Sequence, residues 1–129
     1  MKYNGFTLIE IMITVAIVAL LSTLAIPNIL RARINAQETL AISTLKHIST
    51  ACEVFASANN ALYPGNEAAL TGATPPYLNQ AYCGLNLQGY SYTCNFSVNA
   101  YTITSTPVNP GIAGNRTFTV TTGGIFSMS

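Results

Sequence analysis

The chain has 129 residues, which is enough for one domain with a modest core. Half of its residues are hydrophobic, whereas only 7% are charged, and its formal net charge is +1. This composition excludes a basic nucleic-acid binder, which needs clustered Lys and Arg to displace counterions from phosphates, and it excludes an acidic disordered tail.

The first predicted element is an apolar helix over residues 6–26, in which Glu10 is the only ionisable side chain. A helix of that length spans about 30 Å, which is the thickness of a bilayer's hydrocarbon core. A secretory signal peptide would end at a cleavage site with small residues, whereas this run leads through Pro27 into a second helical pattern. A plain membrane anchor explains the length, and Lys2 before the run favours a cytoplasmic N-terminus. It does not explain Glu10, because an ionisable group inside a bilayer is costly and needs a partner.

The residues around Glu10 suggest that partner. The stretch Gly5-Phe6-Thr7-Leu8-Ile9-Glu10, after a short leader that carries Lys2, closely resembles the class III signal of type IV prepilins. The resemblance implies that prepilin peptidase cuts between Gly5 and Phe6 and that Phe6 is then N-methylated. Glu10 would pair with the new α-ammonium of a neighbouring subunit and so set the axial register during assembly. The alternative is a carboxyl group that the lipid keeps protonated, with no specific partner.

Pro27 predicts an irregularity in the helix. Proline has no N–H to donate and clashes with the preceding turn, so a kink or break is expected around Ser22 to Pro27. In assembled pili of the family that the signal resembles, the stretch before this proline is often unwound, and residues 19–26 could unwind in the same way. This chain lacks the glycine that commonly precedes the proline, and an ordinary proline kink is the alternative.

Beyond Pro27 the pattern is that of an amphipathic helix. Apolar side chains recur at helical spacing on one stripe, which consists of Ile34, Ala41, Leu45, Ile48, Cys52 and Phe55. We predict one long helix from Phe6 to about Asn60, ending before Tyr63-Pro64-Gly65. A coiled coil is the alternative for this stripe, but the β-rich segment that follows needs a surface to pack on.

The C-terminal part predicts a loop and then a sheet. Residues 61–88 are rich in Gly, Pro, Asn and Ala and predict a loop with one short helical turn. In residues 89–98 the even positions are apolar or aromatic, which indicates a strand with one buried face. Further strands are predicted at residues 101–105, 117–122 and 125–128. The expected head is a three- or four-stranded antiparallel sheet packed on the helix.

Residues that support catalysis or metal binding are scarce. The chain has one histidine, His47, no aspartate, and no Gly-rich phosphate loop or paired acids on one element. His47 is predicted to be a surface or packing residue. We therefore predict no enzyme, no cofactor and no metal site.

The three cysteines lie beyond the predicted span, where disulfides can form. A Cys83–Cys94 bridge would close a short loop and fix the start of the sheet, but Cys52–Cys94 and Cys52–Cys83 are alternatives. The remaining thiol is expected to be buried and inert.

Taken together, the patterns predict an α+β fold with a long N-terminal helix and a C-terminal sheet, and the resemblance implies that this is the type IV pilin fold. The expected organisation is a leader at residues 1–5, a hydrophobic transmembrane and filament-core helix at 6–27, an amphipathic half-helix at 28–60, the loop at 61–88, and the sheet at 89–129.

The resemblance implies a major pilin that forms a homo-oligomeric filament, with prepilin peptidase and the pilus assembly machinery as partners and no requirement for nucleic acid. The precursor would lie in the bacterial inner membrane and the filament outside the cell. A minor pilin or a type II secretion pseudopilin is the alternative. The usual major pseudopilin binds calcium through aspartates, which this chain lacks. An anchored binding domain that never polymerises is an alternative of another class.

Overall fold

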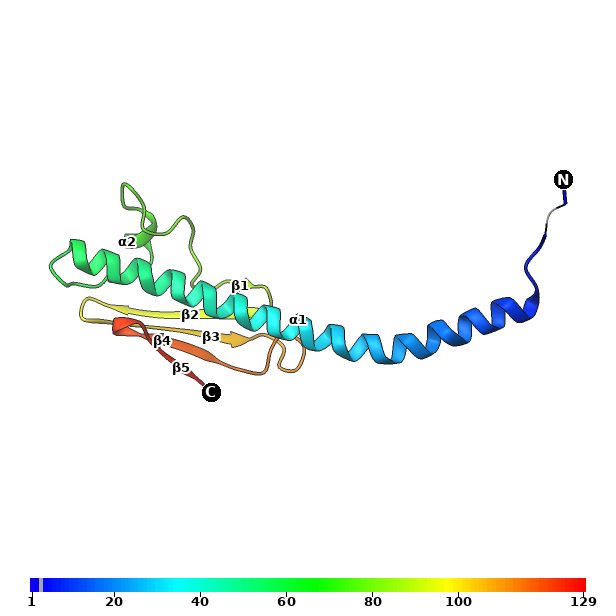
Figure 1. The fold of residues 1–129 in the computed structure, drawn as a ribbon. Helices are drawn as coiled ribbons and strands as arrows, with labels where there is room; N and C mark the ends of the chain where they lie inside the picture. Colours follow the sequence, from blue (N-terminus) through cyan, green and yellow to red (C-terminus); the bar gives the residue numbers. More distant parts are fainter. Residues whose placement is uncertain (3) are drawn as a thin grey trace. The chain divides into compact units, whose positions relative to one another are not determined.

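The computed structural model describes residues 1–2 and 4–129. Its elements follow the order α1 (Leu8–Ala58), α2 (Ala68–Thr71), β1 (Asn86–Leu87), β2 (Tyr90–Ser97), β3 (Ala100–Pro107), β4 (Phe118–Thr121), the 3-10 turn η1 (Thr122–Gly124) and β5 (Ile125–Met128) (Figure 1). The chain divides into an N-terminal unit, Met1–Arg33, and a head, Ile34–Ser129. Helix α1 runs through both units and combines the two predicted helical halves.

The N-terminal unit contains the apolar half of α1. This half is long and apolar enough to cross a membrane, with a mean hydropathy of 2.4 in the most apolar window and none of that window buried. Pro27 lies inside the helix, where its ring removes the N–H that would bond to the carbonyl of Thr23. Helix α1 nevertheless continues through Pro27 in the single chain. Unwinding of residues 19–26 in a filament therefore stays a prediction.

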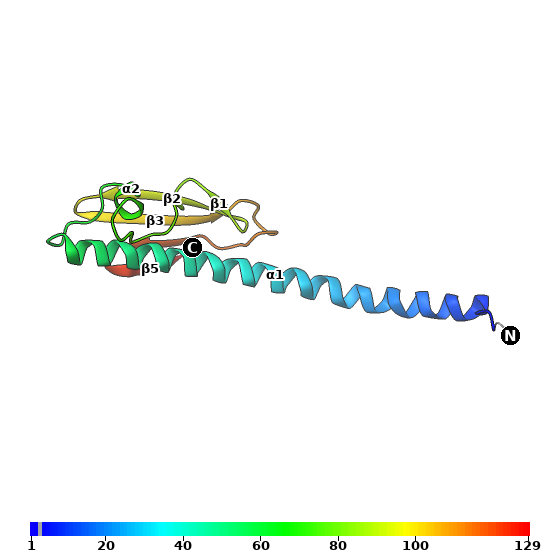
Figure 2. The same ribbon diagram turned by 90° about the horizontal axis from the view of Figure 1, so that it is seen from above.

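The head is built on an antiparallel meander in the order β1-β2-β3-β4-β5. Its register aligns side chains in rows across the strands. Cys94 lies opposite Ile103, which lies opposite Val120, and Val120 lies opposite Phe126. This row faces the second half of α1, which lies across the same face of the sheet (Figures 1 and 2).

The sheet has five strands rather than the three or four that were predicted. The additional strand, β1, has two residues and lies in the segment predicted to be a loop. It pairs Leu87 with Tyr90 across a two-residue turn, in which Gln88 and Gly89 both have positive φ values of 52° and 85°. A strand this short has no readable alternation, and only the glycine at the second turn position indicated a hairpin.

The predicted stripe on α1 forms the helical side of the core. Four of its members are fully buried: Ala41, Leu45, Ile48 and Cys52. They pack against buried side chains of the sheet, which are Tyr90, Tyr92, Tyr101, Ile103, Phe118 and Val120. Each large apolar side chain buried in this way contributes about 1.5–3 kcal/mol relative to exposure. The stripe is thus covered by the chain's own sheet, as the intramolecular interpretation predicted.

Helix α1 ends at Ala58, close to the predicted end near Asn59-Asn60. Asn60 and Ala61 adopt left-handed backbone conformations, with φ values of 55° and 64°. The Ala61 N–H then donates to the carbonyl of Ala56 at 2.8 Å, which satisfies one of the last helical carbonyls.

The disulfide joins Cys83 to Cys94, one of the three pairings that the sequence left open. It ties the segment before β1 to the middle of β2. Cys52 stays free and buried in the core, between the helix and the sheet.

Candidate functional site

The N-terminus of α1 is closed by a reciprocal pair of bonds between Thr7 and Glu10. The backbone N–H and the hydroxyl of Thr7 each donate to Oε2 of Glu10, both at 2.8 Å. In return, the Glu10 N–H donates to the Thr7 hydroxyl oxygen at 3.4 Å. This is a capping box, in which a threonine before the first helical residue and a glutamate three residues later satisfy each other's N–H groups.

The capping box gives Glu10 a structural role within its own chain. The carboxylate is exposed and lies at the positive end of the helix dipole, with two donors from its own chain. Thr7 therefore holds this carboxylate in place within the single chain. Sequence reasoning missed this role, although Thr-x-x-Glu ahead of an apolar run is its recognisable signal.

The predicted cleavage point lies beside the same carboxylate. Residues 4–7 precede α1 without helical or strand structure, and Phe6 is 84% exposed. Apart from Gly5 itself and its two chain neighbours, no described heavy atom lies within 4 Å of the position that a Cβ would take at Gly5, so the backbone there is open. Asn4, Gly5, Phe6 and Glu10 together line a shallow pocket of about 180 Å³. The residues of the predicted cleavage point and Glu10 therefore share one pocket, which Pro27 does not line.

A second cluster of polar groups lies in the head around Glu53. One carboxylate oxygen, Oε1, accepts from the Tyr101 hydroxyl at 2.8 Å and from the Gly123 N–H at 2.8 Å. The other oxygen, Oε2, accepts from the Tyr63 hydroxyl at 3.1 Å. Because Tyr101 donates its only proton to Glu53, Ser49 donates to the Tyr101 oxygen in their contact of 2.8 Å.

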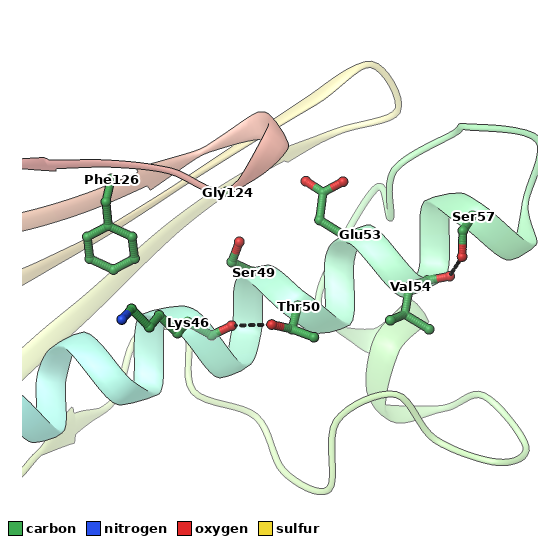
Figure 3. A pocket seen from close by; sticks show the side chains of 8 residues that line it. All are labelled: Lys46, Ser49, Thr50, Glu53, Val54, Ser57, Gly124 and Phe126. Atoms are coloured by element: carbon green, nitrogen blue, oxygen red, sulfur yellow. Dashed lines mark hydrogen bonds between the residues drawn. The ribbon is translucent and has the colours of Figure 1, made fainter.

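Glu53 therefore fastens α1 to three separate segments of the head. Tyr101 belongs to β3, Gly123 to the turn before β5, and Tyr63 to the segment after α1. A groove of about 470 Å³ runs beside this cluster, between α1 and the turn (Figure 3). In Figure 3, Ser49 and Glu53 point from α1 towards the turn that contains Gly124. The cluster therefore ties the turn before the last strand to α1.

The remaining head carboxylates are also held by donors of the same chain. Glu67 accepts from the N–H groups of Tyr82 and Cys83, next to the disulfide. Glu38 accepts from the Asn115 N–H at 3.0 Å. Among the described residues, these carboxylates therefore serve as acceptors for backbone amides, and none forms a salt bridge with Lys or Arg.

His47 lies on the surface, edge-on to the ring of Tyr82 at a centroid distance of 6.1 Å. This position agrees with the prediction of a surface or packing histidine. In the part of the chain that the structure describes, His, Cys, Asp and Glu form no group of three or more that could hold a metal ion.

Burial shifts the acidity of two core groups. It raises the pKa of the Cys52 thiol to about 12, with smaller contributions from the charges of Glu53 and Glu67. Burial also raises the pKa of the Tyr101 phenol, and the hydrogen bond to Glu53 adds to this effect. Both groups are therefore held in their neutral, protonated forms in the folded head.

The head should lose stability as the pH rises above about 9. An unfolded chain releases the Cys52 proton near pH 9, whereas the folded chain keeps it until about pH 12. Between these values the folded state binds more protons, so the free energy of unfolding falls with increasing pH. Urea unfolding followed by near-ultraviolet circular dichroism, from about pH 8 to about pH 11, measures this slope. A Cys52→Ala variant should show a shallower slope at the lower end of the window, and a flat profile in the parent chain would contradict the prediction.

Comparison with known proteins finds one matching family description and several relatives. Residues 1–26 match the family described as the prokaryotic N-terminal methylation motif. The chain is 42% identical over 67 residues to the type IV wide pilus major component PilA4 of Thermus thermophilus, covering 52% of this chain and 50% of the relative. It is 32% identical over 79 residues to the type II secretion system core protein G of Vibrio cholerae, covering 58% and 53%. It is 43% identical over 56 residues to the type IV major pilin protein PilA of Myxococcus xanthus, covering 43% and 26%. No solved structure gives a significant match.

Three observations point to the same family: the methylation motif, the relatives, and the long helix packed on an antiparallel sheet. The chain belongs to the type IV pilin and pseudopilin family. The chain spans about half the length of the Thermus and Vibrio relatives and 26% of the Myxococcus relative, and these relatives divide between type IV pilins and a secretion pseudopilin. Members of the family are structural, non-enzymatic proteins, which confirms the prediction that this subunit is not an enzyme.

In this pilin-family subunit, the contacts that sequence reasoning missed are mainly long-range ones. The partners of Glu53 come from positions 10, 48 and 70 residues further along the chain. Such a cluster has no local spacing to reveal it. The one available signal was Tyr101 in β3, because the hydroxyl of a tyrosine that is buried in a strand needs a hydrogen-bond partner.

Proposed function

We propose that this chain is a major pilin, the structural subunit of a homopolymeric type IV pilus filament. Prepilin peptidase cuts between Gly5 and Phe6, and Phe6 is N-methylated. The pilus assembly machinery then moves the subunit from the bacterial inner membrane into an extracellular filament. The observation that carries this proposal is the placement of Phe6 and Glu10 in one pocket at the start of an exposed apolar helix.

The exposed half of α1 supports a membrane stage followed by a polymer stage. Its large apolar side chains are more than half exposed, among them Leu8, Ile9, Met12, Val15, Val18, Leu20, Leu21 and Leu24. An apolar surface of this extent needs a cover of lipid or of other helices. Exchanging the lipid for the same half-helix of neighbouring subunits provides that cover in a filament.

The chemistry of cleavage supports a docking role for Glu10. Cutting after Gly5 creates a cationic α-amine on Phe6, which lines the same pocket as the carboxylate. Thr7 already fixes the position of that carboxylate, so little freedom is lost when a partner binds. A neighbour's amine that reaches Glu10 in a low-dielectric environment gains a strong ion pair, whereas a misaligned neighbour leaves both charges unpaired.

A subunit of a type II secretion pseudopilus is the second candidate, and a minor pilin is a variant of the first. The pseudopilin is favoured by the relatives named core protein G. The composition speaks against it, because the chain has no aspartate with which to build the usual calcium site of the major pseudopilin. Its head carboxylates accept bonds from its own backbone and tyrosine hydroxyls instead.

Filaments sheared from the surface of producing cells test the proposal. We expect this chain to be their main component and to begin, by mass spectrometry, at Phe6 with one added methyl group. Deleting the gene should remove the filaments and leave protein secretion unchanged, whereas a pseudopilin would show the opposite result. Recovery of the chain only from the membrane fraction would favour the non-polymerising anchored domain. Met1 still attached in surface filaments would contradict the proposed processing.

A further inference from the structure

Two of the chain's five lysines and arginines lie at the end of the apolar half-helix. Arg31 and Arg33 follow an uninterrupted run, residues 6–30, in which Glu10 is the only ionisable group. Both side chains are exposed and belong to the N-terminal unit. Neither forms a salt bridge or a side-chain hydrogen bond within the described residues.

The length of the run places these arginines at a membrane interface. At about 1.5 Å per residue, residues 6–30 extend for about 37 Å, which exceeds the hydrocarbon core of about 30 Å and ends within the headgroup region. Ile29 and Leu30, just before Arg31, are 65% and 53% exposed and so can remain in contact with lipid. The long arginine side chains reach outwards from there to the phosphates.

We propose that Arg31 and Arg33 bind the phosphate groups of anionic phospholipids on the outer side of the inner membrane. This inference rests on the membrane-embedded stage of the proposed function. Cleavage after Gly5 removes Lys2, the cationic side chain at the other end of the span. From then on, Arg31 and Arg33 are the cationic side chains next to the membrane. They hold the processed subunit at the outer leaflet, from which it joins the filament.

The spacing of the two arginines favours lipids over a carboxylate of a second subunit. Residues two apart on a helix point to nearly opposite sides, so Arg31 and Arg33 cannot grip one carboxylate together. Lipids surround the helix and offer each guanidinium a phosphate of matching geometry. The carboxylates Glu38, Glu53 and Glu67 are, in contrast, already engaged by donors of their own chain.

A tryptophan at the end of the span reports which lipids surround it. The chain has no tryptophan, so Leu30→Trp introduces a unique fluorophore beside Arg31. The full chain is placed in phosphatidylcholine vesicles that contain a minor fraction of phosphatidylglycerol. Bromine, which quenches the fluorescence, is carried either by the phosphatidylglycerol or by an equal amount of the phosphatidylcholine. Each arginine enriches anionic lipid about five-fold, so brominated phosphatidylglycerol should quench at least about twice as strongly.

Matched variants test whether the positive charges of Arg31 and Arg33 cause the preference for anionic lipid. Replacing Arg31→Gln together with Arg33→Gln should abolish the preference, while Arg31→Lys with Arg33→Lys should keep most of it. The control is Arg116→Gln, which removes one positive charge from an exposed position in the head and should leave the preference intact. Inorganic phosphate, compared with chloride at equal ionic strength, should not compete. Competition by phosphate would overturn the inference in favour of a general anion site.

The failures of the inference and of the proposed function are distinguishable. Equal quenching by the two brominated lipids would overturn the inference alone. The arginines would then be free to pair with carboxylates of neighbouring subunits. Absence of quenching by either lipid would overturn the membrane stage as well, because the tryptophan would then lie outside the bilayer. A chain that shows the lipid preference but forms no filaments would support the inference and contradict the proposed function.

Discussion

Replacing Glu10→Gln should nearly abolish filament assembly while leaving the helix and its membrane insertion intact. Glutamine preserves the capping box, because its side-chain oxygen can accept the two bonds that Thr7 donates to Glu10. It removes only the negative charge. In a filament, the amine of the neighbouring subunit would then be buried without a counter-charge, which costs about 3–5 kcal/mol. Such a loss at each contact corresponds to a decrease of at least about a hundredfold in subunit affinity.

The measurement is the ratio of sheared filament to membrane-bound subunit, with helix content of the purified subunit as a second readout. Glu10→Ala removes both the charge and the cap and should assemble as poorly as Glu10→Gln. Thr7→Val removes the hydroxyl but retains the charge, so it should cost only about 1 kcal/mol of helix stability and reduce assembly slightly. Normal filament yield from Glu10→Gln would show that Glu10 acts through the cap alone, without the proposed ion pair.

These three variants separate two functions that one side chain combines. In the single subunit, Glu10 belongs to the capping box at the N-terminus of α1 and is held by Thr7. In the proposed filament, the same oxygens face the amine of a neighbour. A carboxylate that is already satisfied within its own chain enters the bilayer at lower cost than an isolated one, because two donors replace part of its hydration. The capping box would thereby make the proposed membrane stage compatible with the charge that the proposed ion pair requires.

The long helix and the inner face of the sheet were predictable because both depend on local periodicity. The stripe that includes Leu45, Ile48 and Cys52 repeats at helical spacing, and each of these residues is buried. The even positions of β2 alternate with polar ones, and Tyr90 and Tyr92 are buried as predicted. Burying these side chains on one face requires no information beyond the spacing along the chain.

The sequence left open those features that depend on tertiary placement. Three cysteines allow three pairings, and only the position of β2 beside the preceding segment brings Cys94 to Cys83. Strand β1 has two residues, too few for a period, and it exists because Gln88 and Gly89 form a tight turn onto Tyr90. The partners of Glu53 are scattered from Tyr63 to Gly123 along the chain, and they meet only once the sheet has packed on α1.

Replacing Glu53→Ala should destabilise the head by about 2–3 kcal/mol, the largest loss expected from any single head carboxylate. Three donors lose their acceptor: the hydroxyls of Tyr63 and Tyr101 and the N–H of Gly123. Tyr101 is almost fully buried, so its hydroxyl loses the acceptor for its proton while it keeps the contact with Ser49. Water can reach the other two donors more easily, which limits the total cost.

The matched control is Glu38→Ala, which removes a carboxylate from the same helix but frees only the N–H of Asn115. That residue is exposed, and water can replace the lost acceptor, so the expected cost is below about 1 kcal/mol. Urea unfolding of the full chain in detergent, followed by the near-ultraviolet signal of the tyrosines, measures both variants. Equal losses for the two variants would contradict a special role for Glu53.

Glu53→Gln tests whether the charge or only the acceptor matters. The carbonyl oxygen of glutamine can replace one carboxylate oxygen, but its NH₂ group then faces a donor that needs an acceptor. We expect an intermediate loss of about 1–2 kcal/mol, because one side of the cluster stays satisfied and the other does not. The turn at Gly123, where φ is 80°, should also become less rigid in this variant. Hydrogen exchange of the β5 amides should therefore accelerate. Unchanged exchange in β5 would show that the last strand is held by its pairing with β4 alone.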